Sequence, residues 1–237
     1  MDKNLILTRE ESHYLARVLR LKKGDLINVV NGYGCLWEAS FQDLKSIQIN
    51  SSFQNPLRKE EKTRNLLCLA VVIPKRGFDE VLRMSCEMGI DIIQPLTSKY
   101  KASNGRSFEK ISRWSTIIKE AVEQSERLWA PEILPTIEFK SWLKKTAHRS
   151  ASSIAMTRDP KAKEIQLWLG DLNCDMEEVW VAIGPEGGWS LEEIALAYES
   201  GCESVCLGDN ILRTSTAAIA ASHLMVAWRR SNYFQSY

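Results

Sequence analysis

The sequence predicts an α/β protein with a mainly parallel sheet, preceded by a small β-rich domain. Residues 65–237 alternate short apolar runs with amphipathic runs of helical spacing, which is typical of a parallel sheet covered by helices on both faces. Residues 26–41 hold two β-rich runs around a turn. Residues 51–64 are polar with little apolar periodicity, as in a linker. We therefore expect one domain over residues 1–64 and another over residues 65–237.

The first elements of the chain carry recognisable start and turn signals. Thr8 and Glu11 have the spacing of a capping box, which predicts the start of a short helix that ends near Arg20. A β-hairpin is expected next over residues 26–41, because the turn Asn-Gly-Tyr-Gly at 31–34 tolerates positive φ. The apolar face of the short helix is expected to comprise Tyr14, Leu15, Val18 and Leu19.

The elements of the second domain follow from the alternation of their patterns. Ligands of parallel sheets sit beyond the carboxyl ends of the strands, so the segments 183–188 and 207–217, which follow two of these strands, are candidates for a site. The predicted strands cover residues 66–73, 90–98, 153–157, 177–184 and 203–208. The predicted helices cover residues 78–89, 110–128, 190–201 and 214–230.

Composition excludes several classes of protein. No apolar run reaches the about 18 residues of a membrane span, and the first residues carry acids where a secretory signal would be basic and then apolar. We therefore expect a cytoplasmic protein without a membrane segment. The six cysteines include no C-x-x-C pair and no partnering histidine cluster, so we expect reduced thiols and no metal.

The net charge is only +1, but basic residues are concentrated near the N-terminus. Residues 1–64 contain 11 Lys and Arg against 8 Asp and Glu. Four cations are crowded together: Arg17, Arg20, Lys22 and Lys23. They could contact the phosphates of a nucleic acid, or they could be solvated cations near a helix C-terminus.

The turn WVAIGPEGGWS at residues 180–190 matches neither glycine-loop template for nucleotides, because its glycines have the wrong spacing, no lysine follows and Pro185 lacks an N–H. Its glycines would let main chain approach a ligand closely, and we expect positive φ and no room for a branched side chain at Gly187. The alternative is a plain strand-to-helix turn with Ser190 and Glu193 as its capping box.

The last predicted helix begins with small residues. Close packing of backbone on backbone and ordinary burial both explain such a face. The face comprises Ala217, Ala218, Ala221, Leu224, Met225 and Trp228.

Five blocks of the chain, in order, resemble those of the ribosomal RNA small subunit methyltransferase E family of the SPOUT superfamily. Members of this family methylate N3 of a uridine, uridine 1498, in 16S rRNA. The blocks are HYLARVLR (13–20), GFDEVLRMSCEMGIDIIQPLTSKY (77–100), RWSTIIKEAVEQSERLWAPEI (113–133), IGPEGGWS (183–190) and LGDNILRTSTAAIAA (207–221).

The resemblance implies a SPOUT-type parallel sheet with a C-terminal trefoil knot, preceded by a small PUA-like β-barrel domain, and a homodimer packed through the knot helices. The knot would bind S-adenosylmethionine in a bent form, with its adenine held by backbone groups. An uncharged, backbone-lined, apolar pocket suits adenosine better than a pyrophosphate. The implied cofactor-binding residues are Ile183, Gly184, Pro185, Gly187, Gly188, Leu207, Gly208, Ile211, Leu212, Thr216 and Ala217.

The resemblance also assigns roles in RNA binding and catalysis. The cations at 17, 20, 22 and 23 would contact 16S rRNA, within the small ribosomal subunit. Arg127 and Arg213 would stabilise the anion of the deprotonated uracil, while Glu123, Glu186 or solvent would take the proton. At Ser215 relatives often have an acid. The alternatives are a 2′-O-ribose RNA methyltransferase of the same superfamily and a non-catalytic rRNA-binding assembly factor.

Overall fold

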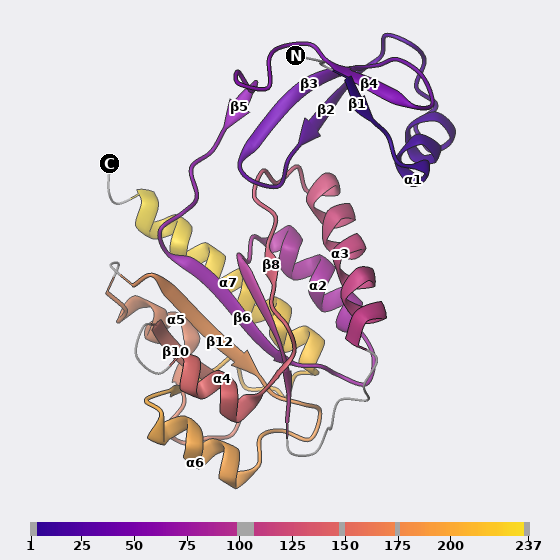
Figure 1. The fold of residues 1–237 in the computed structure, drawn as a ribbon. Helices are drawn as coiled ribbons and strands as arrows, with labels where there is room; N and C mark the ends of the chain where they lie inside the picture. The colour runs from indigo at the N-terminus through magenta and orange to yellow at the C-terminus, as the bar shows by residue number, and fades with distance from the viewer. Residues whose placement is uncertain (1–3, 99–106, 147–149, 174–175, 235–237) are drawn as a thin grey trace. The chain divides into compact units, whose positions relative to one another are not determined.

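The computed structural model describes residues 4–98, 107–146, 150–173 and 176–234 (Figure 1). The chain divides into two units. The first unit comprises Met1–Lys62 together with the segment Glu126–Trp129, and the second comprises Thr63–Ser125 and Ala130–Tyr237. The return of the segment at 126–129 to the first unit was not expected from the sequence.

The first unit is a five-stranded antiparallel sheet in the order β1-β4-β3-β2, with β5 paired to β3. The predicted hairpin over residues 26–41 is confirmed as β2 and β3. β1 and β4 were not predicted, and β5 lies inside the stretch expected to be a linker. The strands are β1 Asn4–Ile6, β2 Leu26–Val30, β3 Cys35–Phe41, β4 Ser46–Ile49 and β5 Arg58–Lys59.

The predicted short helix is present, but its second half is not α-helical. α1 spans Arg9–His13, and its capping box between Thr8 and Glu11 is confirmed. η1, a π-helix, spans Tyr14–Val18, with the backbone N–H of Leu19 bonded to the carbonyl of Tyr14 at 3.0 Å.

The predicted apolar face of the short helix is only partly buried, because the second half of the helix is a π-helix. Tyr14, Val18 and Leu19 are 47%, 59% and 47% exposed, whereas Leu15 packs against the core of the first unit. The physical reason is that i→i+5 bonding changes the number of residues per turn, so residues spaced for an α-helix no longer share one face.

A glycine in the hairpin turn joins the segment Glu126–Trp129 to the first unit. Gly34 has φ 87°, and a Cβ there would lie 2.4 Å from the carbonyl oxygen of Glu60 and 2.7 Å from the ring of Trp129. The backbone N–H of Gly34 donates to Leu128 at 2.8 Å, and the indole N–H of Trp129 donates to Glu60 at 3.1 Å. Only glycine fits this position.

The second unit confirms the predicted parallel α/β fold. Its eight-stranded sheet has the order β11-β13-β10-β12-β6-β7-β8, with β9 also paired to β7, and every pairing between these strands is parallel. The strands are β6 Leu66–Val72, β7 Ile92–Thr97, β8 Glu132–Ile133, β9 Ile137–Glu138, β10 Ser150–Ala155, β11 Lys163–Glu164, β12 Glu178–Ile183 and β13 Glu203–Cys206.

Helices cover both faces of this sheet (Figure 1). α7 packs against α2, α5, β6 and β12 on one face, with α3 on α2, and α4 and α6 pack together on the other face. The sequence did not predict α4 or α5. The helices are α2 Phe78–Met88, α3 Ser107–Gln124, α4 Phe139–Thr146, α5 Ile165–Gly170, α6 Leu191–Glu199 and α7 Thr214–Phe234.

The sheet has its topological switch point between β6 and β12. β6 is the first strand of this sheet along the chain, and the next strand, β7, lies on one side of it while β12 lies on the other. In open α/β sheets the crevice beyond the carboxyl ends of two such strands is the usual place of a ligand. Here those ends lead into residues 73–77 and 184–190.

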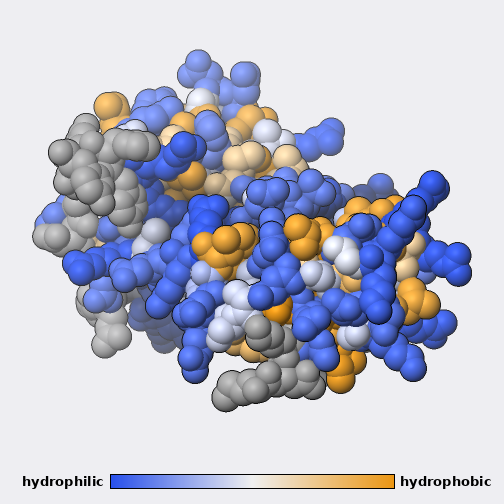
Figure 2. Space-filling view, turned by 90° about the horizontal axis from the view of Figure 1, so that it is seen from above, coloured by the Kyte–Doolittle hydropathy of each residue, from blue (hydrophilic) through white to orange (hydrophobic). Residues whose placement is uncertain are grey.

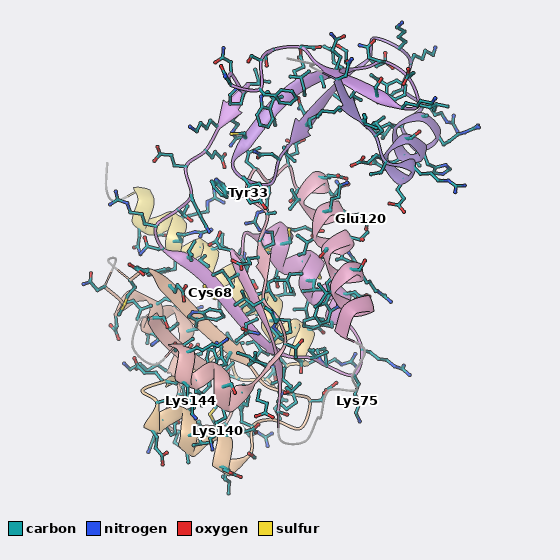
Figure 3. The ribbon with its side chains drawn as sticks, in the orientation of Figure 1. Tyr33, Cys68, Lys75, Glu120, Lys140 and Lys144 are labelled. Carbon is teal, nitrogen blue, oxygen red and sulfur yellow. The ribbon has the colours of Figure 1, made fainter. Side chains whose placement is uncertain are left out.

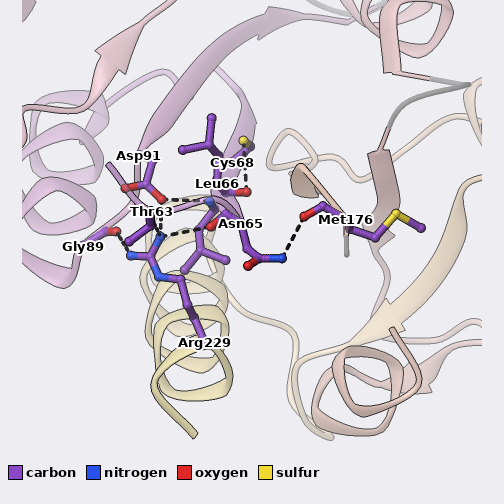
Figure 4. Close-up of polar contacts among 9 residues, drawn as sticks. Thr63, Asn65, Leu66, Cys68, Gly89, Asp91, Met176 and Arg229 are labelled. Atoms are coloured by element: carbon purple, nitrogen blue, oxygen red, sulfur yellow. Dashed lines mark hydrogen bonds and ion pairs between the residues drawn. The ribbon is translucent and has the colours of Figure 1, made fainter. Parts of the chain in front are cut away.

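The other end of β6 is held to α7 by a part-buried ion pair (Figure 4). Arg229 on α7 pairs through Nη1 with Asp91 Oδ2, and the two side chains are 13% and 12% exposed. Nη2 of Arg229 donates to the carbonyl of Gly89 at 3.0 Å, and Asp91 Oδ2 accepts from the backbone N–H of Leu67 at 2.9 Å. The pair therefore links α7 with the end of α2 and the start of β6.

The surface in Figure 2 is mainly hydrophilic, with apolar residues in small, separate groups. Within the described ranges, no helix has both the length and the apolar character that crossing a membrane requires. No disulfide joins the described cysteines to one another, and burial raises the pKa of Cys202 to about 12. Cys174 lies outside the described residues.

Candidate functional site

The structure brings together the two segments that the sequence singled out. The hydroxyl of Thr214, at the start of α7, donates to the carbonyl oxygen of Gly184 at 3.0 Å. Thr214 is 4% exposed, so this hydrogen bond is shielded from water. It ties the end of β12 to the start of α7 at the switch point of the sheet. Thr214 was not among the predicted site residues, although its neighbours in the RTST stretch were.

The glycine turn after β12 has one packed side and one open side. A Cβ on Gly184 would lie 3.0 Å from the ring of Trp189, so this glycine makes room for the tryptophan. The indole N–H of Trp189 donates to the carbonyl of Ala155 at 3.3 Å, which fixes the turn against the end of β10. A Cβ on Gly187 or Gly188 would meet nothing within 4 Å.

The strain expected at Gly187 is found at its neighbour. The φ of Gly187 is outside the left-handed region, whereas Gly188 has φ 74° and donates its N–H to Pro185 at 2.9 Å. The prediction for Gly187 was wrong because the turn closes through Gly188. A side chain at Gly188 would therefore be strained, even though space is available.

The capping box that was the alternative interpretation of this turn is also present. The side chain of Ser190 accepts from the backbone N–H of Glu193 at 3.2 Å, and the Glu193 carboxylate accepts from Ser190 at 2.8 Å. Glu193 is 6% exposed. The box starts α6, and no described side chain lies within 4 Å of a Cβ built on Gly187 or Gly188, so the two interpretations are compatible.

The segment between β13 and α7 forms the second wall of the site. Gly208 has φ 124° and open space around its α-carbon, and its carbonyl accepts from the Cys206 thiol at 3.1 Å. Leu207 and Leu212 are half-buried, and Ile211 is 67% exposed. Among hydrogen bonds between described residues, none uses the backbone N–H of residues 210–212. The wall therefore combines apolar side chains with available main-chain donors, which suits a flat, neutral, polar-edged ligand.

The loop after β6 lies against both of these segments. The backbone N–H of Lys75 donates to Oε1 of Glu186 in the glycine turn at 2.7 Å. A Cβ on Gly77 would lie 4.0 Å from the Cβ of Ser215 at the start of α7. The loop at 73–77 is thus part of the rim of the site, a placement that the sequence did not predict.

The loop after β10 is held by a small polar cluster. Tyr198 on α6 donates its hydroxyl to Asp159 and lies 3.1 Å from the hydroxyl of Ser204, and the backbone N–H of Lys161 donates to Asp159 at 2.9 Å. Burial opposes ionisation of Asp159, but these hydrogen bonds lower its pKa overall. Burial and the bond to Asp159 raise the pKa of Tyr198.

The predicted catalytic residues are spread over the chain. Arg213 is exposed and directly precedes Thr214 at the site. Glu123 is exposed near the end of α3, which stops at Gln124, earlier than predicted. Arg127 is half-buried in the segment Glu126–Trp129 of the first unit. Their roles in catalysis stay predictions.

The remaining predicted residues fall where the sequence placed them along the chain. Thr216 is exposed and Ala217 is 8% exposed in the first turn of α7. Arg17, Arg20, Lys22 and Lys23 are all exposed in the first unit. Over the described part of the chain, no group of three or more His, Cys, Asp or Glu side chains could hold a metal ion.

Comparison with known families agrees with this arrangement. Residues 60–226 match the model of the RNA methyltransferase domain, and residues 7–51 match the model of the RNA methyltransferase PUA domain. The chain belongs to the RNA methyltransferase family. The predicted resemblance and the PUA-like first domain are thereby confirmed.

Curated relatives from this RNA methyltransferase family extend over most of the chain. The ribosomal RNA small subunit methyltransferase E of Synechocystis sp. is 33% identical over 222 residues, which are 93% of this chain and 72% of the relative. The protein of the same name from Rickettsia conorii is 30% identical over 211 residues, with 88% and 83% covered.

Two solved structures share the fold of the chain. The ribosomal RNA small subunit methyltransferase E of Neisseria gonorrhoeae, bound to S-adenosyl methionine, has a TM-score of 0.79 at 27% identity and covers 94% of this chain and 91% of its own. A putative methyltransferase of Legionella pneumophila, in complex with bound cofactor SAM, has a TM-score of 0.83 at 27% identity, with 95% and 92% covered.

Proposed function

We propose that the protein transfers the methyl group of S-adenosylmethionine to N3 of a uridine, uridine 1498, in 16S rRNA. The observation that carries the proposal is the junction of the glycine turn with the start of α7 through Thr214 and Gly184, at the switch point of a sheet in a chain of the RNA methyltransferase family. The relative from Neisseria gonorrhoeae is bound to the same cofactor.

The residues at this site fit the cofactor. The main-chain donors at 210–212 could bond the edge of an adenine, while Leu207, Ile211 and Leu212 could pack against its faces. The open α-carbons of Gly187, Gly188 and Gly208 leave room for a ligand close to the backbone. The other residues proposed for the cofactor are Ile183, Gly184, Pro185, Thr216 and Ala217.

S-adenosylmethionine supplies an electrophilic methyl group on a positively charged sulfur. The protein would have to align N3 of the uracil with that methyl group and to accept the N3 proton. The N3–H bond would break, the N3–C bond would form as the C–S bond to the methyl group breaks, and S-adenosylhomocysteine would leave. Arg213 and Arg127 would hydrogen-bond the carbonyl oxygens of the uracil and stabilise its anion. Glu123, Glu186 or solvent would take the proton.

The first unit is proposed to bind the RNA around the target. The stretch that matches the PUA domain contains Arg17, Arg20, Lys22 and Lys23, all of them exposed. Contacts of such cations with phosphates give affinity and register rather than sequence recognition. We further propose that the protein works in the cytoplasm on the small ribosomal subunit.

A trefoil knot and a homodimer packed through the knot helices complete the proposal. Much of the small-residue face of α7 is covered by its own chain, since Ala218, Ala221 and Met225 are fully buried. A second subunit would therefore pack against other residues of α7, such as the exposed His223. We expect light scattering at micromolar concentration to give the mass of a dimer, and a monomer would contradict this part of the proposal.

The reaction is tested by mapping the methylated nucleosides of 16S rRNA after incubation with the protein and labelled S-adenosylmethionine. A methyl group on N3 of one uridine supports the proposal. A methyl group on a ribose 2′-oxygen would indicate the other activity of the superfamily. Binding of both RNA and cofactor without transfer would indicate a non-catalytic assembly factor.

Gly188→Val is expected to weaken the binding of S-adenosylmethionine at least tenfold, because a branched side chain disfavours the φ of 74° and would enter the open side of the turn. Isothermal titration measures the effect. Gly201→Val is the matched control, because Gly201 also has positive φ (81°) and open space but lies after α6. Equal affinity of the Gly188 variant and the unmodified protein would show that the turn does not bind the cofactor.

A further inference from the structure

Two loops with exposed cations flank the glycine turn. The strands β10, β12 and β6 are neighbours in that order, so the turn after β12 lies between the loops that follow β10 and β6. The loop after β6 carries Lys75 and Arg76, and the loop after β10 carries Arg158, all of them exposed. Figure 3 labels Lys75 in the loop after β6.

Both loops are attached to the glycine turn or to its helix. On one side, the backbone N–H of Lys75 donates to Glu186 at 2.7 Å. On the other side, Trp189 donates to Ala155 at the end of β10, and Tyr198 on α6 donates to Asp159, next to Arg158. The cations therefore lie beside the site on loops whose backbone is held in place by these hydrogen bonds.

Described carboxylates form no ion pairs with these cations, Lys75, Arg76 and Arg158. Asp159, the carboxylate adjacent in sequence to Arg158, accepts hydrogen bonds from Tyr198 and from the backbone of Lys161. The side chains at 75, 76 and 158 thus place positive charge on two sides of the glycine turn, in which Glu186 carries a carboxylate.

We propose that Lys75, Arg76 and Arg158 bind the phosphates of the RNA strand on either side of the methylated nucleotide. This inference rests on the proposed function. A nucleotide that is turned into a pocket leaves its two flanking phosphates at the rim, and cations on both sides of the rim fix the strand across it. Exposed cations with this placement suit a polyanion that passes over the glycine turn better than a small ligand held against its backbone.

The test uses the full-length protein with Lys75→Ala/Arg76→Ala, with Arg158→Ala and with a matched control. In Lys144→Ala/Lys145→Ala two exposed positive charges are removed from the last turn of α4. α4 connects the carboxyl end of β9 with the amino end of β10, so its last turn lies at the opposite edge of the sheet. Lys144 is labelled on α4 in Figure 3.

The readout is the affinity for a 16S rRNA fragment at several salt concentrations. The slope of log K against log salt should become shallower by about 0.7 for each lost phosphate contact, so by about 1.4 in the Lys75/Arg76 variant and about 0.7 in the Arg158 variant. KM for the RNA should rise with little change in kcat, because these contacts form before the reaction. The control slope should stay near that of the unmodified protein.

Three results would overturn the inference. Equal slopes in the rim variants and the unmodified protein would show that these cations make no phosphate contacts. An equal change in the α4 control would show a general effect of net charge. A loss of S-adenosylmethionine affinity in the rim variants would assign the cations to the cofactor instead. If the unmodified protein still methylates the RNA, each of these results overturns the inference and leaves the proposed function standing. An unmodified protein that neither binds nor methylates the RNA would overturn the inference and the proposed function together.

Discussion

Arg229→Ala is expected to lower the free energy of unfolding by up to about 3–5 kcal/mol, the cost of breaking a fully buried ion pair, because it leaves the part-buried carboxylate of Asp91 without this cation. The pair is 13% and 12% exposed. Arg229 also donates to the carbonyls of Gly89 and Asn65, at 3.0 and 3.3 Å, so the variant removes two further hydrogen bonds. Urea denaturation followed by circular dichroism measures the change.

Arg230→Ala is the matched control, because Arg230 is the next residue of α7 and is exposed. It should change the free energy of unfolding by less than about 0.5 kcal/mol. The double variant Asp91→Asn/Arg229→Met should recover part of the loss, since it removes the uncompensated charge. If Arg229→Ala and Arg230→Ala are equally stable, the ion pair does not hold α7 in place.

The sequence predicted those parts of the fold that depend on local periodicity. The strands β6 and β12 are buried apolar runs, α2 and α6 have helical spacing, and α6 also has a capping box, so each is visible within its own segment. The short strands β8, β9 and β11 were not predicted. Each has only two residues, which are too few to show the alternation of a strand. Each forms because the backbone of a longer neighbouring strand is available for pairing.

The sequence predicted which segments form the candidate site, but it did not predict which of their residues contact one another. The topology rule places 183–188 and 207–217 at the same edge of the sheet, and the structure joins them through Thr214. No sequence pattern indicates that Thr214, and not Thr216, faces Gly184, because the choice depends on the rotation of α7 about its axis relative to β12. Lys75 was missed for a similar reason, since its contact with Glu186 joins residues distant in the sequence.

The η1 segment shows a different limit. The spacing of Tyr14, Leu15, Val18 and Leu19 fits an α-helix, but the first unit buries only part of this set. A π-turn is rare, and no pattern of apolar residues announces it. It lies in the block that resembles the family signature and includes Arg17, so the exposed residues there are available for a partner.

Arg127→Ala is expected to lower the single-turnover rate of methylation by about 10²–10³, with little effect on the affinity for cofactor or RNA. An arginine that bonds the developing anion of the uracil stabilises the transition state and not the ground state. Rapid-quench measurements with saturating protein and labelled cofactor give this rate. Arg127→Lys should recover only part of it, because an ammonium keeps the charge but loses the planar pair of donors.

Arg17→Ala/Arg20→Ala is the matched counterpart, with both substitutions among the exposed cations of the first unit. Arg20 has φ 56°, and alanine keeps its Cβ, so the backbone strain at this position is unchanged. This variant should bind RNA more weakly and with a shallower salt dependence, while its single-turnover rate at saturating RNA stays near that of the unmodified protein. If Arg127→Ala instead weakens RNA binding and leaves the single-turnover rate unchanged, Arg127 belongs with these positioning residues. Arg213, which directly precedes Thr214 at the site, would then be the remaining arginine that could stabilise the anion.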